Sequence, residues 1–125
     1  MQNKGKPMSS ITPGTNLCTL INVFTVAPGR QQELVDALVE ITDQVIRTLP
    51  GFVSANIHKS IDGVRVTNYA QWESPAALQA MLSNPEASKH IKKCQEIAEH
   101  IDFHLYTVEH CSTAEGKTIS SPAIS

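Results

Sequence analysis

Residues 52–75, FVSANIHKSIDGVRVTNYAQWESP, decide the fold. β-branched and aromatic residues are frequent on both sides of Asp62-Gly63, a turn signal typical of a β-hairpin. This pattern predicts strands over residues 52–60 and 64–73, paired as a hairpin. Ser74-Pro75 then predicts the start of a helix, because serine caps a helix N-terminus and proline is favoured at the first helical position.

The hairpin lies between two further pairs of elements. Upstream, residues 17–26 (LCTLINVFTV) predict a strand, and residues 30–49 predict an amphipathic helix that stops at Pro50-Gly51. Downstream, Asn84-Pro85 interrupts the helix, helical spacing resumes over residues 86–100, and a last strand covers about residues 102–110. The order β-α-β-β-α-β predicts a ferredoxin-like α+β fold, with a four-stranded antiparallel sheet and both helices on one face.

Length and composition indicate one domain. The chain has 125 residues, of which 41% are hydrophobic and 18% charged, so residues 17–111 can bury a core. Polar segments without periodicity, residues 1–16 and 112–125, are expected to be flexible tails. A net charge of -2 argues against nucleic acid and anionic membranes as partners. With no long apolar segment and no apolar signal core, we expect a cytoplasmic protein.

The first strand predicts an oligomer. Leu20 and Phe24 lie on one of its faces, while Leu17, Ile21 and Val23 lie on the other, so the strand is apolar on both sides. Helices cover only one face of a ferredoxin-like sheet, and no further element remains for the other face. We therefore expect the second face to pack on a symmetric copy, giving a homodimer.

Two amides lie where apolar side chains are expected. By strand parity, Asn22 shares a face with Leu20 and Phe24, and Asn68 shares one with Val66 and Trp72. The two strands are central neighbours in this topology, so both amides can face the space under the helices. A buried amide without a partner costs about 1–3 kcal/mol. Either the backbone satisfies each amide, or the two donors orient a ligand in an apolar pocket.

Several motifs together carry a family resemblance: NVFTVAPG, LPGF, the IDG turn and NYAQWES. Over roughly residues 17–111 the chain resembles the antibiotic biosynthesis monooxygenase family, whose members form dimeric α+β barrels. It is most similar to the cofactor-independent anthrone oxygenases of aromatic polyketide pathways. Their first-strand asparagine and third-strand N-x-x-x-W pair correspond here to Asn22, Asn68 and Trp72, which the resemblance implies are catalytic.

The resemblance implies oxidation of an anthrone-like or quinol-like polycyclic aromatic by O₂ to the quinone. An anthrone methylene is acidic because its carbanion is delocalised into the ring carbonyl, and that anion can reduce O₂ directly. No cofactor or metal is expected, since the three cysteines form no C-x-x-C pair and no phosphate-binding motif occurs. Side-chain donors of the three residues would bind the enolate oxygen. The apolar residues expected to bind the substrate are Leu20, Phe24, Val66 and Met81. No histidine stands out as a general base.

Two alternatives stay open. Haem-degrading members of the same fold also carry an asparagine on the first strand, but they pair it with a tryptophan and an iron-ligating histidine in the second helical region. Here Met81 stands at the tryptophan position, and His90 is one residue from the ligand position, which Ile91 occupies. A non-catalytic dimer that binds a small aromatic is the other alternative, because fold alone does not determine activity.

Overall fold

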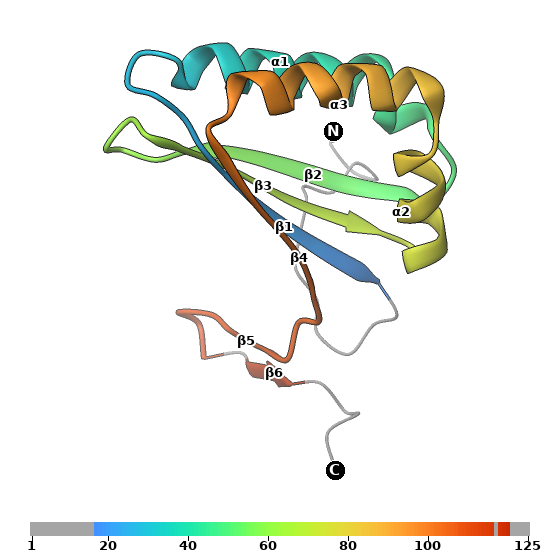
Figure 1. Cartoon of the computed structure of the whole chain (residues 1–125). Helices are drawn as coiled ribbons and strands as arrows, with labels where there is room; N and C mark the ends of the chain where they lie inside the picture. The colour runs from blue at the N-terminus through green and yellow to red at the C-terminus, as the bar shows by residue number, and fades with distance from the viewer. Residues whose placement is uncertain (1–16, 117, 121–125) are drawn as a thin grey trace, which may run out of the picture.

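The computed structural model describes residues 17–116 and 118–120. The predicted ferredoxin-like α+β fold is confirmed: four strands form an antiparallel sheet in the order β2-β3-β1-β4. The strands are β1 (Cys18–Thr25), β2 (Phe52–Lys59), β3 (Arg65–Trp72) and β4 (His100–Tyr106). The helices are α1 (Gln31–Gln44), α2 (Pro75–Leu82) and α3 (Pro85–Ile97). Helices α1 and α3 lie side by side over one face of the sheet, and α2 lies at one end of it (Figure 1).

Helix α1 is shorter than predicted. It ends at Gln44 instead of Leu49, and a 3₁₀ turn, η1 (Ile46–Thr48), follows. The apolar spacing continues through this turn, which is why the periodicity predicted a longer helix. Leu49 is extended (φ -86°, ψ 146°), as expected for the residue before a proline, so the α-helix cannot continue into Pro50.

The predicted break at Asn84-Pro85 is confirmed and separates α2 from α3. The Asn84 side-chain oxygen Oδ1 accepts hydrogen bonds from the backbone N–H groups of Glu86 (2.9 Å) and Ala87 (3.0 Å), so it caps α3. Ser74 caps α2 in the same way, since its Oγ accepts from the Ala77 N–H at 3.1 Å. These caps fix where each helix starts.

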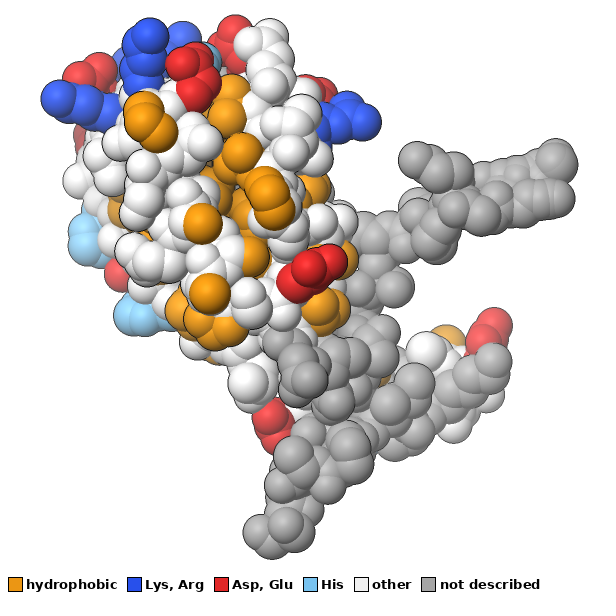
Figure 2. All heavy atoms as spheres, turned by 90° about the vertical axis from the view of Figure 1, so that its right-hand side faces the viewer, with side chains coloured by type: hydrophobic (Ala, Val, Ile, Leu, Met, Phe, Trp, Pro, Cys, Tyr) orange, Lys and Arg blue, Asp and Glu red, His pale blue; other side chains and the backbone are white. Residues whose placement is uncertain are grey.

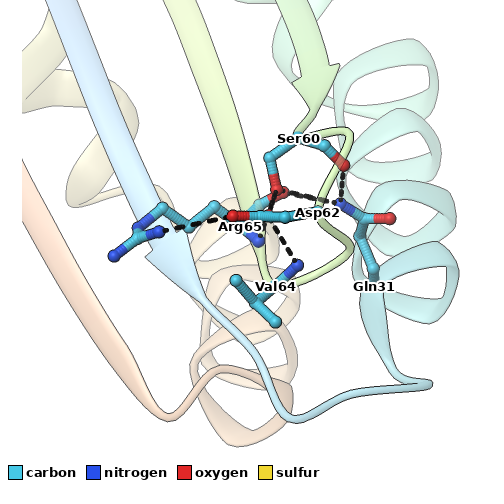
Figure 3. Close-up of polar contacts among 5 residues, drawn as sticks. All are labelled: Gln31, Ser60, Asp62, Val64 and Arg65. Carbon is cyan, nitrogen blue, oxygen red and sulfur yellow. Dashed lines mark hydrogen bonds and ion pairs between the residues drawn. The ribbon is translucent and has the colours of Figure 1, made fainter.

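The hairpin turn between β2 and β3 also holds the start of α1 (Figure 3). Gln31 Nε2 donates to the backbone oxygens of Ser60 at 2.9 Å and Arg65 at 2.8 Å. Within the turn, Asp62 Oδ1 accepts from the Ser60 hydroxyl and from the Val64 N–H. The first turn of α1 is therefore fixed against the sheet, which sets the position of the helix above β2 and β3.

The C-terminal region differs from the prediction. The last strand of the main sheet covers His100–Tyr106, and two short strands, β5 (His110–Ser112) and β6 (Thr118–Ser120), pair with each other. This pairing was not predicted within the expected tail, residues 112–125. Gly116, with φ +88°, takes the left-handed conformation that the turn between the strands needs. The two strands lie on the side of the sheet away from the helices (Figure 1). The expected tail at residues 1–16 lies outside the described residues.

The core between the helices and the sheet has two parts. Cluster A contains Leu20, Ile41, Trp72 and Met81 among its buried residues, and cluster B contains Phe24, Leu34, Leu38 and Cys94. Most single domains of this size have one contiguous core. The gap between the clusters is therefore a feature that needs an explanation. No helix among the described residues has the length and apolar character needed to cross a membrane.

Candidate active site

A cavity of about 300 Å³ lies between the helical layer and the sheet. Its floor comes from β1, β3 and β4, and its roof comes from α1, η1, α2 and α3. Of the four residues expected to bind the substrate, Leu20, Phe24 and Met81 line it, whereas Val66 is fully buried in cluster B and does not. The lining is mainly apolar, which suits an aromatic ligand.

Asn22 and Asn68 both line this cavity and lie side by side on its floor. They are direct register partners on β1 and β3, which places their Cβ atoms about 5 Å apart. On the same face of the sheet, the neighbouring pair on one side, Leu20 and Ala70, belongs to cluster A, and the neighbouring pair on the other side, Phe24 and Val66, belongs to cluster B. The pair of Asn22 and Asn68 thus separates the core into cluster A and cluster B.

Neither amide oxygen has a partner. The Oδ1 atoms of Asn22 and Asn68 are buried and accept no hydrogen bond from any described residue. Other amides in the structure are satisfied: Asn56 donates to the Tyr69 carbonyl at 3.2 Å, and buried Gln71 donates to the Thr19 hydroxyl at 3.2 Å. Backbone satisfaction therefore does not account for the amide pair in the cavity. A native domain keeps such groups at a cost of about 1–3 kcal/mol each, which is typical of functional sites.

Trp72 shares the strand face of Asn68 but does not line the cavity. Its side chain is 1% exposed and packs edge-to-face on Phe52, with ring centroids 5.4 Å apart. It belongs to cluster A together with Leu20 and Met81, both of which do line the cavity. The indole therefore lies behind the wall of the cavity, and the structure brings together only two of the three predicted catalytic residues.

The cavity contains one titratable group, the thiol of Cys94. Burial raises its pKa to about 11, so it is neutral at physiological pH. None of the five histidines lines the cavity. His90 lies 3.3 Å from the Glu86 carboxylate, and its neighbour Ile91 lines the cavity instead. The position that the haem alternative requires is thus held by an apolar side chain.

Among the described residues, no group of three or more His, Cys, Asp or Glu side chains could hold a metal ion. The cavity lining is neutral and mainly apolar, with the side-chain amides of Asn22 and Asn68 on its floor. Such a site can bind and polarise a carbonyl or phenolic oxygen.

Several lining residues were not predicted. Thr42 on α1, Gln95 on α3 and Phe103 on β4 all border the cavity. Phe103 is the register partner of Asn22 on the strand opposite β3, so strand parity contained the signal for it. For Thr42 and Gln95 the sequence carries no comparable signal, because both are polar and flank the apolar stripes of their helices.

A second hollow, of about 310 Å³, lies beside α2 and is lined by Leu49, Ala77 and Ala80 among others. It shares Met81 with the main cavity. Figure 2 views the molecule from this side and shows hydrophobic side chains in the middle of the face, with most lysines and arginines toward the helical layer.

This chain is similar to known proteins in sequence and in fold. A family model described as antibiotic biosynthesis monooxygenase matches residues 18–93. The curated tetracenomycin-F1 monooxygenase of Streptomyces glaucescens is 48% identical over 91 residues, which are 73% of this chain and 81% of the relative.

Solved structures share the fold. SnoaB, a cofactor-independent oxygenase from Streptomyces nogalater, aligns with a TM-score of 0.69 and 21% identity, covering 78% of this chain and 97% of its own. A monooxygenase from the gene ActVA-Orf6 of Streptomyces coelicolor, in complex with Nanaomycin D, aligns with a TM-score of 0.69 and 25% identity, covering 79% of this chain and 92% of its own.

Proposed function

Because this chain belongs to the antibiotic biosynthesis monooxygenase family, we propose that it oxidises an anthrone-like or quinol-like polycyclic aromatic with O₂, without a cofactor. One observation carries the proposal: Asn22 and Asn68, whose side-chain oxygens have no hydrogen-bond partner among the described residues, lie side by side on the floor of an otherwise mainly apolar cavity. The curated relative and the two solved structures are all described as oxygenases, and one of them as cofactor-independent. They support the monooxygenase class, while the anthrone-like or quinol-like substrate is inferred from the family resemblance and is compatible with the mainly apolar cavity.

The substrate supplies the electrons in the proposed reaction. Loss of one methylene proton from an anthrone gives an enolate, which transfers an electron to O₂. The resulting radicals combine to form a C–O bond and a peroxide. Loss of the second methylene proton, with cleavage of the O–O bond, then gives the quinone and water. One CH₂ group and one O₂ thereby become one C=O group and one H₂O.

The amide pair stabilises the enolate oxygen in this proposal. Each asparagine has an NH₂ group with two donors, and a mainly apolar wall strengthens hydrogen bonds to an anion. A hydrogen bond to a charged group contributes about 1.5–3 kcal/mol. Asn22 and Asn68 together can therefore lower the pKa of a bound anthrone by about 2 units or more, at 1.4 kcal/mol per unit.

The neutrality of the cavity favours a substrate that is itself acidic. The one titratable lining group, Cys94, holds its proton because burial raises its pKa to about 11, so it is a poor base near pH 7. A substrate whose C–H bond is activated by an adjacent ring carbonyl needs no strong protein base. Water at the mouth of the cavity then accepts the first proton.

Trp72 has a place in the proposal because it shares the β3 face of Asn68, four residues further along the strand, with Ala70 between them. Leu20 and Met81 lie in the same cluster as its ring, and methionine is the most adaptable apolar side chain. If Met81 moves aside when a polycyclic substrate binds, the indole N–H of Trp72 becomes exposed at the edge of the cavity. There it would add a third donor for the enolate oxygen.

We also propose that the protein acts as a homodimer. None of the described helices covers the face of the sheet that carries Ile21 and Tyr69 (Figure 1). On the same face, Tyr106 of the edge strand β4 is 45% exposed, and Ile21 and Tyr69 are only partly buried, as expected of an interaction surface. A second copy placed on this face would cover it. Sedimentation velocity tests the proposal, since a monomer at micromolar concentration contradicts it.

Oxygen uptake tests the proposed activity. Purified protein, stripped of metals, is given dithranol as a model anthrone, with a buffer blank to subtract autoxidation. We expect uptake well above the blank and a large loss in Asn68→Leu. The same protein given haem should show no shift of the Soret band relative to free haem. Absence of uptake in the wild-type protein contradicts the anthrone assignment.

A further inference from the structure

The roof of the cavity carries a second polar pair opposite the floor amides. Thr42 of α1 and Gln95 of α3 line the same cavity as Asn22 and Asn68. The two helices are neighbours above the sheet (Figure 1). Leu38 lies one helical turn before Thr42, and Cys94 directly precedes Gln95. Both Leu38 and Cys94 belong to cluster B, which lies next to the amide pair. The roof pair therefore lies near the level of the floor pair along the cavity.

The chemistry of the two roof groups is complementary. The Thr42 hydroxyl donates its hydrogen to the Leu38 carbonyl at 2.7 Å, so its oxygen faces the cavity as an acceptor. Gln95 has an NH₂ group and lies at the exposed end of the cavity, one helical turn after Ile91. The roof thus offers one donor and one acceptor in a mainly apolar wall.

The proposed function fixes how an anthrone lies between floor and roof. The substituents of an aromatic ring lie in the ring plane. When the floor amides hold the oxygen on one edge of the ring, the opposite edge therefore faces the roof. In an anthrone that opposite edge is the reacting methylene carbon, para to the carbonyl across the central ring. O₂ must therefore form its bond with carbon at the roof.

We propose that Gln95 is a catalytic residue that binds the oxygen added by O₂, a role that rests on the proposed function. When the enolate and O₂ have combined, the negative charge lies on the terminal peroxide oxygen, and Gln95 Nε2 donates to it. After that oxygen takes a proton from water, the hydroperoxide O–H donates to the Thr42 oxygen. Loss of the second methylene proton and departure of hydroxide then give the quinone, and the proton and hydroxide make water.

The inference also defines the ligand. A substrate that satisfies both pairs carries an oxygen on one edge and, after reaction, a second oxygen on the opposite edge of the same ring. The product class is therefore a para-quinone rather than an ortho-quinone, whose two oxygens lie on one edge.

Separating the two half-reactions tests the role of Gln95. Under anaerobic conditions in D₂O, exchange of the dithranol methylene hydrogens, followed by NMR, reports enolate formation at the floor. Oxygen uptake at varied O₂ concentration reports the step at the roof. For Gln95→Leu we expect exchange within about twofold of wild type and a fall of about tenfold or more in kcat/KM for O₂. Thr42→Val should show a smaller fall of the same kind.

Gln79→Leu is the matched control, because Gln79 is exposed on α2 and does not line the cavity. It should leave both rates unchanged. The inference is overturned if Gln95→Leu lowers exchange and uptake together, since Gln95 then acts in binding or packing. It is equally overturned if neither rate changes. If the wild-type protein itself catalyses neither exchange nor uptake, the proposed function fails, and this outcome is distinct from the other two.

Discussion

Replacing Asn68 by leucine should make the protein more stable while it destroys activity. The Asn68 oxygen is buried without a partner, so its removal recovers about 1–3 kcal/mol of desolvation cost. The cavity of about 300 Å³ leaves room for the larger side chain. We expect a net gain of about 1–2 kcal/mol, or roughly 5–10 °C in Tm for a domain of this size. Loss of one donor to the enolate should lower kcat about 10²–10³-fold.

Urea unfolding at fixed protein concentration measures the stability, with the fluorescence of Trp72 as the probe. This residue is the single tryptophan of the chain and is buried, so its emission reports loss of the core. Asn84→Ala is the control of opposite sign, because Asn84 Oδ1 accepts two backbone hydrogen bonds and its loss should cost about 1 kcal/mol. If Asn68→Leu is less stable than wild type, the amide is a structural element of the fold and the reasoning is refuted.

Trp72→Phe should keep the domain folded, since phenylalanine can still pack in cluster A, but lower turnover at least tenfold through loss of the indole N–H; full activity in O₂ uptake would contradict that role. Burial raises the Cys94 pKa from 9.0 to about 11, so the folded protein holds this proton more tightly than the unfolded chain does. The resulting stability, about 2–3 kcal/mol, is fully present below pH 9 and is lost as the pH rises through 11. Urea unfolding at pH 8 and 10.5 should therefore show a smaller alkaline loss in Cys94→Ala than in wild type. Gly51→Ala should cost about 2–5 kcal/mol, because φ is +85° and the new Cβ would clash with the Cβ of Ala77. Gly63→Ala, at the same φ but with open space, should cost only about 1 kcal/mol in the same assay.

Strand parity was enough to predict the amide pair. Side chains alternate along a strand, and the Asp62-Gly63 turn sets the pairing of β2 and β3, so the faces follow from the sequence. The direct pairing of Asn22 with Asn68 agrees with that pattern. The catalytic roles assigned to both residues stay predictions.

Features that depend on three-dimensional packing were not predictable in this way. Whether Trp72 borders the cavity or lies behind its wall depends on side-chain packing that strand parity does not describe. The identity of Thr42 and Gln95 as roof residues depends on how each helix is rotated about its axis above the sheet. The β5–β6 pairing was missed because its strands are only three residues long and carry no clear alternation.

The central claim is that the cavity stabilises the enolate of its substrate. An anaerobic titration of dithranol bound to the protein, followed by absorbance over pH, measures the pKa of the bound anthrone directly. We predict a pKa about 2 units below that of free dithranol, with most of the shift lost in the Asn22→Leu, Asn68→Leu double variant. An unchanged pKa, with dithranol shown to be bound, would contradict the account.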